Sequence, residues 1–265
     1  MKQNKKFLVI GGDLRQAHLA GRLAEEGYCV SGFLFDKDVE LSDLVCQVKQ
    51  IEEALEANDV IILPLPITVD GETVNALFSD QKFSLKRCFT NINPKAQVFG
   101  GKVDPPIAAL AAERGIEITD YLKREELAVL NAVPTGEGTV AIAMQELPTT
   151  LFGLECLITG YGRISKVLMK QLTGLGVKIT VAARKYSDLA WIKISGCKAI
   201  HMSEIETCEK PFDLVINTVP AVILNEKVLS GLKKDCLVID LASKPGGDGG
   251  IWDKNSKSFI IIDRR

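Results

Sequence analysis

The sequence lacks an excess of positive charge, a metal-binding motif and a long apolar run. Its formal net charge is −2, so no broad basic field is available to hold nucleic acid or an anionic membrane. The only histidines are His18 and His201, and neither an HExxH motif nor a Cys/His cluster is present. We therefore expect no nucleic acid partner and no metal.

Neither the cysteines nor the apolar runs indicate export or membrane insertion. The seven cysteines are scattered without CxxC spacing, as is typical of a protein in a reducing cytoplasm. The apolar run after the basic opening stops at Gly11, which is too short for a signal peptide. No run approaches the roughly twenty apolar residues that a membrane span needs. These features predict a cytoplasmic protein that does not associate with membranes.

Strand-like apolar runs alternate with helix-length segments along almost all of the 265 residues. This alternation is typical of parallel sheets with helices on both faces. The strands of a first series are expected near 7–10, 29–33, 60–63, 97–99 and 116–119. Those of a second series are expected near 156–159, 178–182, 214–217, 237–240 and 259–262. We predict an α/β fold of two doubly wound Rossmann-like domains with a cleft between them.

The predicted boundary divides a substrate-side domain, residues 1–148, from an NAD(P)-binding domain, residues 149–265. Two hinge helices are expected within about 123–147, because the segment 131–138 between them is rich in Gly and Pro.

The start of the second hinge helix is a candidate substrate anchor. Thr135 is expected to cap that helix, and the N–H groups from Gly136 onward are expected to bind a substrate carboxylate. Glu137 is either a general base or a carboxylate favoured by the helix dipole.

The most informative motif is the turn Gly160-Tyr161-Gly162-Arg163-Ile164-Ser165, which follows an apolar run and opens an apolar-periodic helix. Gly160 allows a tight turn, Gly162 lets a pyrophosphate approach the backbone, and Ser165 preserves close packing of helix and strand. The N–H groups of the helix start then face the phosphates. The motif predicts a dinucleotide site; an ordinary tight turn is the alternative.

The segment after the next expected strand bears on the choice of cofactor. It reads Ala183-Arg184-Lys185, where an NAD-binding domain usually has an acidic residue for the ribose. Arg184 offers a planar donor group for a 2′-phosphate, so we predict NADP, with NAD as the other possibility. A solvated surface arginine is the alternative.

Two later strand ends are expected to border the nicotinamide. Thr218, Val219 and Pro220 would line its ribose and ring, and Ser243 or Lys244 would reach the carboxamide or an acidic substrate. A pair of ordinary turns is the alternative.

The first strand and its turn resemble the later motif, with Asp13 in place of its second glycine. Gly11-Gly12-Asp13 aligns with Gly160-Tyr161-Gly162, so Asp13 places a carboxylate where a pyrophosphate would have to approach. We therefore expect the first half to bind substrate. Asp13 and Arg15 either contact substrate or cap the helix and pair with each other. His18 is either a proton acceptor or a packed or surface residue.

Five segments together are typical of one known family: Gly11–Gln16, Pro64–Pro66, Asn131–Gly138, Gly160–Ser165 and Asp240–Gly247. Through them the chain resembles the family of dipicolinate synthase A subunits over nearly its whole length. The resemblance implies oxidation of dihydrodipicolinate, or of its hydroxylated tetrahydro precursor, to dipicolinate with reduction of NAD(P). It also implies a partner, the flavoprotein-like B subunit of the synthase, and a role in the mother cell of sporulating bacteria, on a branch of the lysine pathway. A homo-oligomer is expected.

One departure from that family concerns the end of the chain. Family members usually continue with a further strand, a Pro-rich loop and a helix that returns to the first domain. The chain ends at Arg265, so we expect this closing helix to be missing.

Several roles stay open at this point. A substrate with two carboxylates needs two anchors, for which Arg15, the helix start at Thr135 and Lys244 are candidates. The proton acceptor is Asp13, His18 or Glu137. One alternative enzyme is suggested by Pro64-Leu65-Pro66, which resembles methylenetetrahydrofolate dehydrogenases. Their Tyr-x-x-x-Lys pair is lacking at Tyr28 and Tyr121. A non-catalytic regulatory protein that binds NADP is a further alternative.

Overall fold

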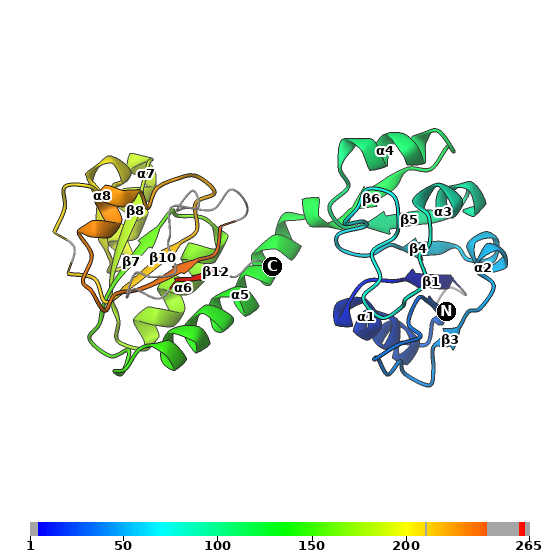
Figure 1. Ribbon diagram of the computed structural model, residues 1–265, viewed down its shortest axis with the longest axis horizontal. Helices are drawn as coiled ribbons and strands as arrows, with labels where there is room; N and C mark the ends of the chain where they lie inside the picture. Colours follow the sequence, from blue (N-terminus) through cyan, green and yellow to red (C-terminus); the bar gives the residue numbers. More distant parts are fainter. Residues whose placement is uncertain (1–4, 210, 243–259, 263–265) are drawn as a thin grey trace. The chain divides into compact units, whose positions relative to one another are not determined.

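The computed structural model describes residues 5–209, 211–242 and 260–262. It divides into two compact units, Met1–Leu127 and Ala128–Arg265 (Figure 1). The division lies earlier in the chain than the boundary expected from the sequence, because most of the helix that links the two halves belongs to the second unit.

The first unit is a parallel sheet with strand order β3-β2-β1-β4-β5-β6. Chain order and bounds are β1 Lys6–Ile10, α1 Leu14–Glu25, β2 Cys29–Phe33, β3 Cys46–Gln47, α2 Ile51–Ala57, β4 Val60–Ile62, α3 Leu85–Asn91, β5 Gln97–Gly100, α4 Pro105–Ala112, β6 Ile118–Asp120 and the 3-10 turn η1 Tyr121–Lys123. Since the order reverses direction beside β1, the carboxyl ends of β1 and β4 form the switch point at which ligands bind in such sheets.

The second unit repeats this topology with strand order β12-β11-β10-β7-β8-β9. Chain order and bounds are α5 Glu125–Glu146, β7 Glu155–Thr159, α6 Arg163–Gly174, β8 Lys178–Ala183, α7 Tyr186–Ile194, β9 Lys198–His201, the 3-10 turn η2 Met202–Glu204, β10 Leu214–Asn217, α8 Glu226–Ser230, β11 Leu237–Asp240 and β12 Ile260–Ile262. Its switch point lies beside β7, whose carboxyl end is the turn at Gly160.

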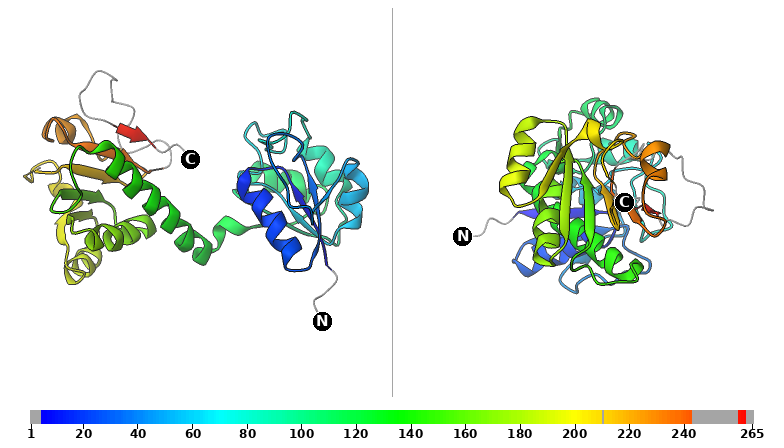
Figure 2. Two further views of the ribbon diagram at one scale, coloured as in Figure 1. Left: turned by 90° about the horizontal axis from the view of Figure 1, so that it is seen from below. Right: turned by 90° about the vertical axis from the view of Figure 1, so that its left-hand side faces the viewer.

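Each central strand is apolar on both faces because helices cover both sides of the sheet. In β1, Leu8 and Ile10 belong to a core that includes residues of α2, α3 and α4, whereas Val9 belongs to a core formed with α1. Figure 2 shows α1 on the face opposite to that group. The second sheet is covered by α5, α6 and α7 on one face and by α8 and η2 on the other. The predicted class, two doubly wound α/β units, is confirmed.

The predicted break at 131–138 is wrong, because α5 runs without interruption from Glu125 to Glu146. Pro134 lies inside it and removes one backbone donor, which costs about 3 kcal/mol in a helix interior. Burial of one face opposes this cost. Ala132, Gly136, Thr139 and Ala143 are all buried, and Gly136 lies against Val167 and Gln171 of α6.

By length and composition, α5 is also the one helix among the described residues that is apolar enough to cross a membrane. Helices that pack inside a protein core can have the same length and composition. Ala143 of α5, and Leu147 just beyond the end of the helix, belong to the second core. The sequence led us to expect no segment long and apolar enough to span a membrane, and α5 corrects that expectation. No membrane role follows from its length and composition.

Candidate cofactor and substrate sites

The turn after β7 is shaped by the conformation of Gly160. Its φ is +92°, and a Cβ there would lie 2.7 Å from Thr218 Oγ1 and 2.9 Å from a methyl of Val219. Only glycine satisfies both requirements. The Gly160 N–H donates to the carbonyl of Ala182 (2.8 Å), which fixes the turn to the neighbouring strand β8.

The start of α6 is open to a ligand. Gly162 is the N-cap and, as a glycine, has no side chain with which to cap the helix. Among the described residues, a Cβ at Gly162 would meet nothing within 4 Å, so no described side chain or backbone crowds the N-cap position of α6. The first-turn N–H groups, at the positive end of a helix of 12 residues, suit a phosphate. The residues present therefore fit the diphosphate of a dinucleotide.

The remaining residues of the motif have structural contacts. Tyr161 and Ile164 are half-buried against the second core, and Lys166 Nζ lies 4.9 Å from the centre of the Tyr161 ring. Arg163 is exposed. Ser165 is fully buried, with its Oγ 2.9 Å from Thr218 Oγ1.

The Thr218 hydroxyl forms hydrogen bonds within the protein. It donates to the Thr159 carbonyl (2.8 Å), so the Ser165 hydroxyl donates to it in turn. Val219 is half-buried and Pro220 exposed, beside the turn at Gly160. Ser243 and Lys244, the other residues expected near the nicotinamide, lie outside the described residues.

A buried polar row at the ends of three neighbouring strands was not predicted. The register pairs Asn217 of β10 with Thr159 of β7 and with Asp240 of β11. Asn217 Nδ2 donates to Asp240 Oδ1 (2.8 Å), and Thr159 Oγ1 donates to Asn217 Oδ1. Asn217 also bonds both backbone groups of Val219, at 3.0 and 3.2 Å. The row thus holds the loop that follows β10, as fully paired buried polar groups do. Its sequence signal is a polar residue ending each of three apolar strands.

In the first unit the equivalent helix start is closed by the protein itself. Asp13 is the N-cap of α1, and its carboxylate accepts from the Arg15 backbone N–H (2.9 Å). The Gln16 side chain accepts from the Asp13 N–H (3.2 Å), which completes a capping box. A carboxylate therefore occupies the place that a bound anion would take at the start of α1.

Asp13 and Arg15 pair with each other, which was one of the two interpretations of these residues. The Arg15 Nη2 lies 2.7 Å from Asp13 Oδ2, and the hydrogen bond from the Arg15 side chain lowers the pKa of Asp13. A carboxylate with a lowered pKa is a weak base at neutral pH, so the pairing disfavours Asp13 as the proton acceptor.

Tyr121, at the end of β6, lies near this pair and was not selected from the sequence. Arg15 Nη2 donates to the Leu65 carbonyl (3.1 Å), and the Tyr121 hydroxyl lies 3.4 Å from the Leu63 carbonyl. Burial raises the pKa of Tyr121 to about 12, and Arg15 opposes this increase. Three strand ends, those of β1, β4 and β6, thus place a guanidinium and a neutral phenol together at the carboxyl edge of the sheet. Only the fold reveals this proximity.

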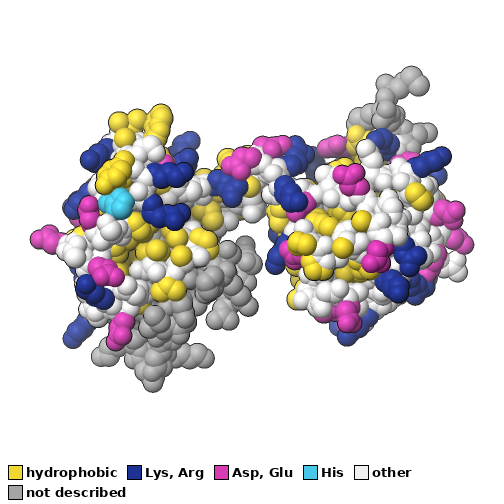
Figure 3. All heavy atoms as spheres, turned by 90° about the horizontal axis from the view of Figure 1, so that it is seen from above, with side chains coloured by type: hydrophobic (Ala, Val, Ile, Leu, Met, Phe, Trp, Pro, Cys, Tyr) yellow, Lys and Arg dark blue, Asp and Glu magenta, His cyan; other side chains and the backbone are white. Residues whose placement is uncertain are grey.

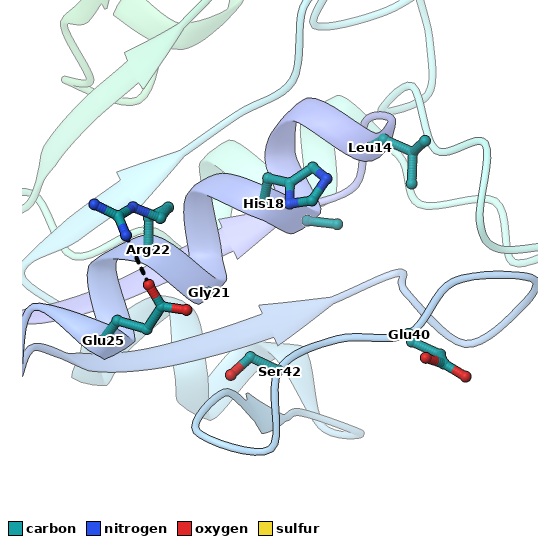
Figure 4. A pocket seen from close by; sticks show the side chains of 8 residues that line it. Leu14, His18, Gly21, Arg22, Glu25, Glu40 and Ser42 are labelled. Atoms are coloured by element: carbon teal, nitrogen blue, oxygen red, sulfur yellow. Dashed lines mark hydrogen bonds and ion pairs between the residues drawn. The ribbon is translucent and has the colours of Figure 1, made fainter.

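His18 points toward a different feature. Figure 4 shows it on α1, opposite the loop that carries Glu40 and Ser42. It is exposed and lines a small pocket of about 140 Å³ together with Arg22 and Glu25, which pair with each other at 2.9 Å. The structure thus places His18 on the flank of α1.

The expected anchor at Thr135 is corrected by the continuous helix. Thr135 is an interior residue of α5 whose hydroxyl donates to the Asn131 carbonyl (3.1 Å), and it caps no helix start. The N–H groups of Gly136 and its successors belong to the hydrogen-bond ladder of the helix and cannot bind a carboxylate. Glu137 is an exposed residue on the same helix.

Two doubly wound parallel sheets, one of them with a glycine N-cap at the helix after its first strand, define a protein with the fold of two-domain nicotinamide dehydrogenases. D-lactate dehydrogenase from Escherichia coli shares this fold over 98% of this chain and 82% of its own, with a TM-score of 0.57 and 12% identity.

More similar proteins are dipicolinate synthase A subunits. Residues 6–122 match the family model described as the N-terminal domain of the dipicolinate synthase A subunit. The dipicolinate synthase A subunit from Bacillus subtilis (strain 168) is 32% identical over 245 residues, which cover 91% of this chain and 82% of that protein. The chain therefore belongs to the family of dipicolinate synthase A subunits.

Solved structures agree with this assignment. The dipicolinate synthase A chain from Bacillus subtilis has a TM-score of 0.87 and 28% identity, covering 99% of this chain and 89% of that chain. The A subunit of the synthase from Bacillus halodurans has a TM-score of 0.90 and 26% identity, covering 100% and 91%. Family membership gives no support to the alternative of a methylenetetrahydrofolate dehydrogenase.

Proposed function

We propose that the chain is an NADP-linked dehydrogenase that oxidises dihydrodipicolinate, or its hydroxylated tetrahydro precursor, to dipicolinate. The observation that carries this proposal is the open start of α6 behind Gly160, in a chain of the dipicolinate synthase family. Oxidation of a ring carbon needs a hydride acceptor, and the second unit offers a place for one.

The cofactor is assigned to the second unit. The N–H groups from Gly162 to Ser165 would hold its diphosphate, and Arg184 would favour NADP through the 2′-phosphate. A bound NADP would supply the hydride acceptor for the oxidation. The row of Thr159, Asn217 and Asp240 positions the Val219 loop beside that site.

The substrate is assigned to the first unit. Arg15 stays charged, because its pairing with Asp13 raises its pKa further, and it is more than half exposed, so it can donate to a substrate carboxylate. Tyr121 adds a neutral donor nearby. Lys244 is proposed as the second anchor, and His18 or Glu137 as the proton acceptor.

The proposal also covers a partner chain, the oligomeric state and the cellular location. A family whose members are called subunits implies a partner chain, and we propose the flavoprotein-like B subunit of dipicolinate synthase in that role. We further propose a homo-oligomer that acts in the cytoplasm of the mother cell during sporulation.

The test is cofactor reduction by the purified full chain with NADP and a freshly generated lysine-pathway intermediate, with and without the flavoprotein-like partner. Formation of NADPH together with dipicolinate supports the proposal. Binding of NADP without turnover under both conditions would instead support a regulatory protein.

A matched pair of variants tests the cofactor site in the same assay. Gly162→Asp places at the second turn the residue found at position 13, and its Cβ would meet no described atom within 4 Å. We expect NADP to bind at least about tenfold more weakly, since a carboxylate then faces the diphosphate. Asp13→Asn, which keeps a capping side chain at the first turn, is the control and should leave the NADP affinity unchanged. Equal affinity of Gly162→Asp and the unchanged protein would refute the site.

A further inference from the structure

Beyond the turn at Gly160, the ends of β8 and β9 carry a group of basic and aromatic side chains. The register pairs Ala183 with His201, so Arg184, Lys185 and Tyr186 follow one strand directly beside the end of the next. Arg184 and Lys185 are exposed, and no ion pair or hydrogen bond of either side chain is found within the described part of the chain. Figure 3 shows Lys and Arg side chains gathered beside an imidazole on this unit.

His201 is held by contacts with Ser203 and Arg184 that indicate which ring nitrogen carries the hydrogen. Its Nδ1 accepts from the Ser203 N–H (3.3 Å) and lies 2.7 Å from the Ser203 hydroxyl. Its Nε2 lies 3.0 Å from the Arg184 carbonyl, an acceptor only. Nε2 therefore carries the hydrogen and donates it to Arg184, which holds the backbone at the point where the Arg184 side chain leaves the strand.

Tyr186 lies on the His201 ring. The two ring centres are 5.5 Å apart and the planes differ by 19°, while the Tyr186 side chain is 80% exposed. One face of the phenol is thus held by the imidazole and the other is open. An exposed aromatic ring held flat beside two cations is suited to a planar base that carries a phosphate.

We propose that Arg184, Lys185 and Tyr186, held by His201, form a recognition site for 2′-phosphoadenosine. Tyr186 stacks on the adenine and the two cations hold the 2′-phosphate. His201 is a positioning residue that acts through Arg184 and Tyr186. The inference rests on the proposed cofactor site and adds to it the groups that distinguish NADP from NAD.

The test uses two fragments of the cofactor, 2′,5′-ADP and 5′-AMP, titrated calorimetrically into the full chain. It needs neither substrate nor a partner protein, so its outcome is separate from that of the turnover assay. The unchanged protein should bind 2′,5′-ADP at least about tenfold more tightly than 5′-AMP, since only the former carries the 2′-phosphate.

Four variants separate the roles of the three side chains. Arg184→Ala should remove the preference for 2′,5′-ADP. Tyr186→Ser should weaken both fragments by about tenfold, because both contain adenine. His201→Phe keeps a ring under Tyr186 but loses the donor, so it should weaken 2′,5′-ADP severalfold and 5′-AMP little, with no further loss when combined with Arg184→Ala. His201→Gln retains an N–H at the position of Nε2 and should restore part of the binding of 2′,5′-ADP. It also replaces His201→Phe in the comparison if that variant does not fold.

Trp191→Ser, on the same helix, is the control for removing an exposed aromatic and should bind both fragments normally. If Arg184→Ala leaves the fragment preference unchanged, the proposed 2′-phosphate contact is wrong. If Arg184→Ala removes it while Tyr186→Ser and both His201 variants behave like the unchanged protein, NADP recognition by Arg184 stands and the inference on Tyr186 and His201 is overturned.

Discussion

A single position distinguishes the two helix starts of this chain. Gly162 leaves the first turn of α6 open, whereas Asp13 fills the first turn of α1 with its own carboxylate. This difference was visible in the aligned motifs, because a carboxylate at an N-cap is read from local sequence. Tyr121 and His201 could not be selected in that way. Their neighbours, Leu63 and Arg184, are distant in sequence and meet them only through strand pairing.

The charge of Asp13 makes the stability of the first unit depend on pH. Asn also caps helices, so Asp13→Asn removes mainly the ion pair with Arg15. The folded-state pKa of Asp13 is lowered, so its contribution is complete above the ordinary value of about 3.9 and is lost as the pH falls through the folded-state pKa. Because Arg15 is 58% exposed, we expect Asp13→Asn to cost only about 0.5 kcal/mol at neutral pH.

Urea denaturation of both proteins between pH about 7 and pH about 3 checks this expectation. The difference in free energy of unfolding should shrink toward zero at the acid end. A difference that stays constant with pH would show that the ion pair is not its cause.

At the scale of elements, α5 is a helix that local sequence preferences do not predict. Gly and Pro between 131 and 138 predict a break, and in an isolated peptide they would produce one. Tertiary packing overrides the propensity here. Gly136 brings α5 so close to α6 that a Cβ would lie 2.9 Å from a methyl of Val167, and this contact involves residues about thirty positions apart that no local pattern reveals.

Two alanine substitutions in α5 separate packing from propensity. At Gly138 a Cβ would meet nothing within 4 Å, so Gly138→Ala should stabilise the protein by about 0.5–1 kcal/mol through helix propensity. At Gly136 the same gain is opposed by contacts of 2.5 Å with Gln171 Oε1 and 2.9 Å with Val167, and overpacking costs about 1–3 kcal/mol. Gly136→Ala should therefore be the less stable variant by at least about 1 kcal/mol.

Thermal and urea unfolding of the two variants give the comparison directly. Far-ultraviolet circular dichroism establishes that both retain their helix content. Equal stabilisation by the two alanines would mean that α5 does not pack closely on α6 at Gly136.

For the whole molecule, the alternation of apolar runs and helices was enough to predict two doubly wound sheets. Buried parallel strands are apolar on both faces and therefore stand out in sequence. The strands that were missed, β3 and β9, are short and lie at sheet edges, where Lys198 and Cys46 are exposed. Because β9 was not predicted, there was no reason from sequence to place His201 beside Arg184, and His201 was left out of the candidate site.

Because the two units share one topology, the intact chain contains its own control for cofactor binding. Hydrogen exchange of the full chain, with and without NADP, should show slower exchange at the amides of residues 161–166, since a bound diphosphate occupies the open first turn of α6 and stabilises the folded state of the second unit. The amides of residues 12–17 should exchange equally fast in both conditions, because Asp13 and Gln16 already cap α1. The Gly162→Asp variant should lose the protection at 161–166 with no change at 12–17. Protection by NADP at 12–17 and none at 161–166 would reverse the assignment of the two units, and the substrate would then have to be sought at the second sheet.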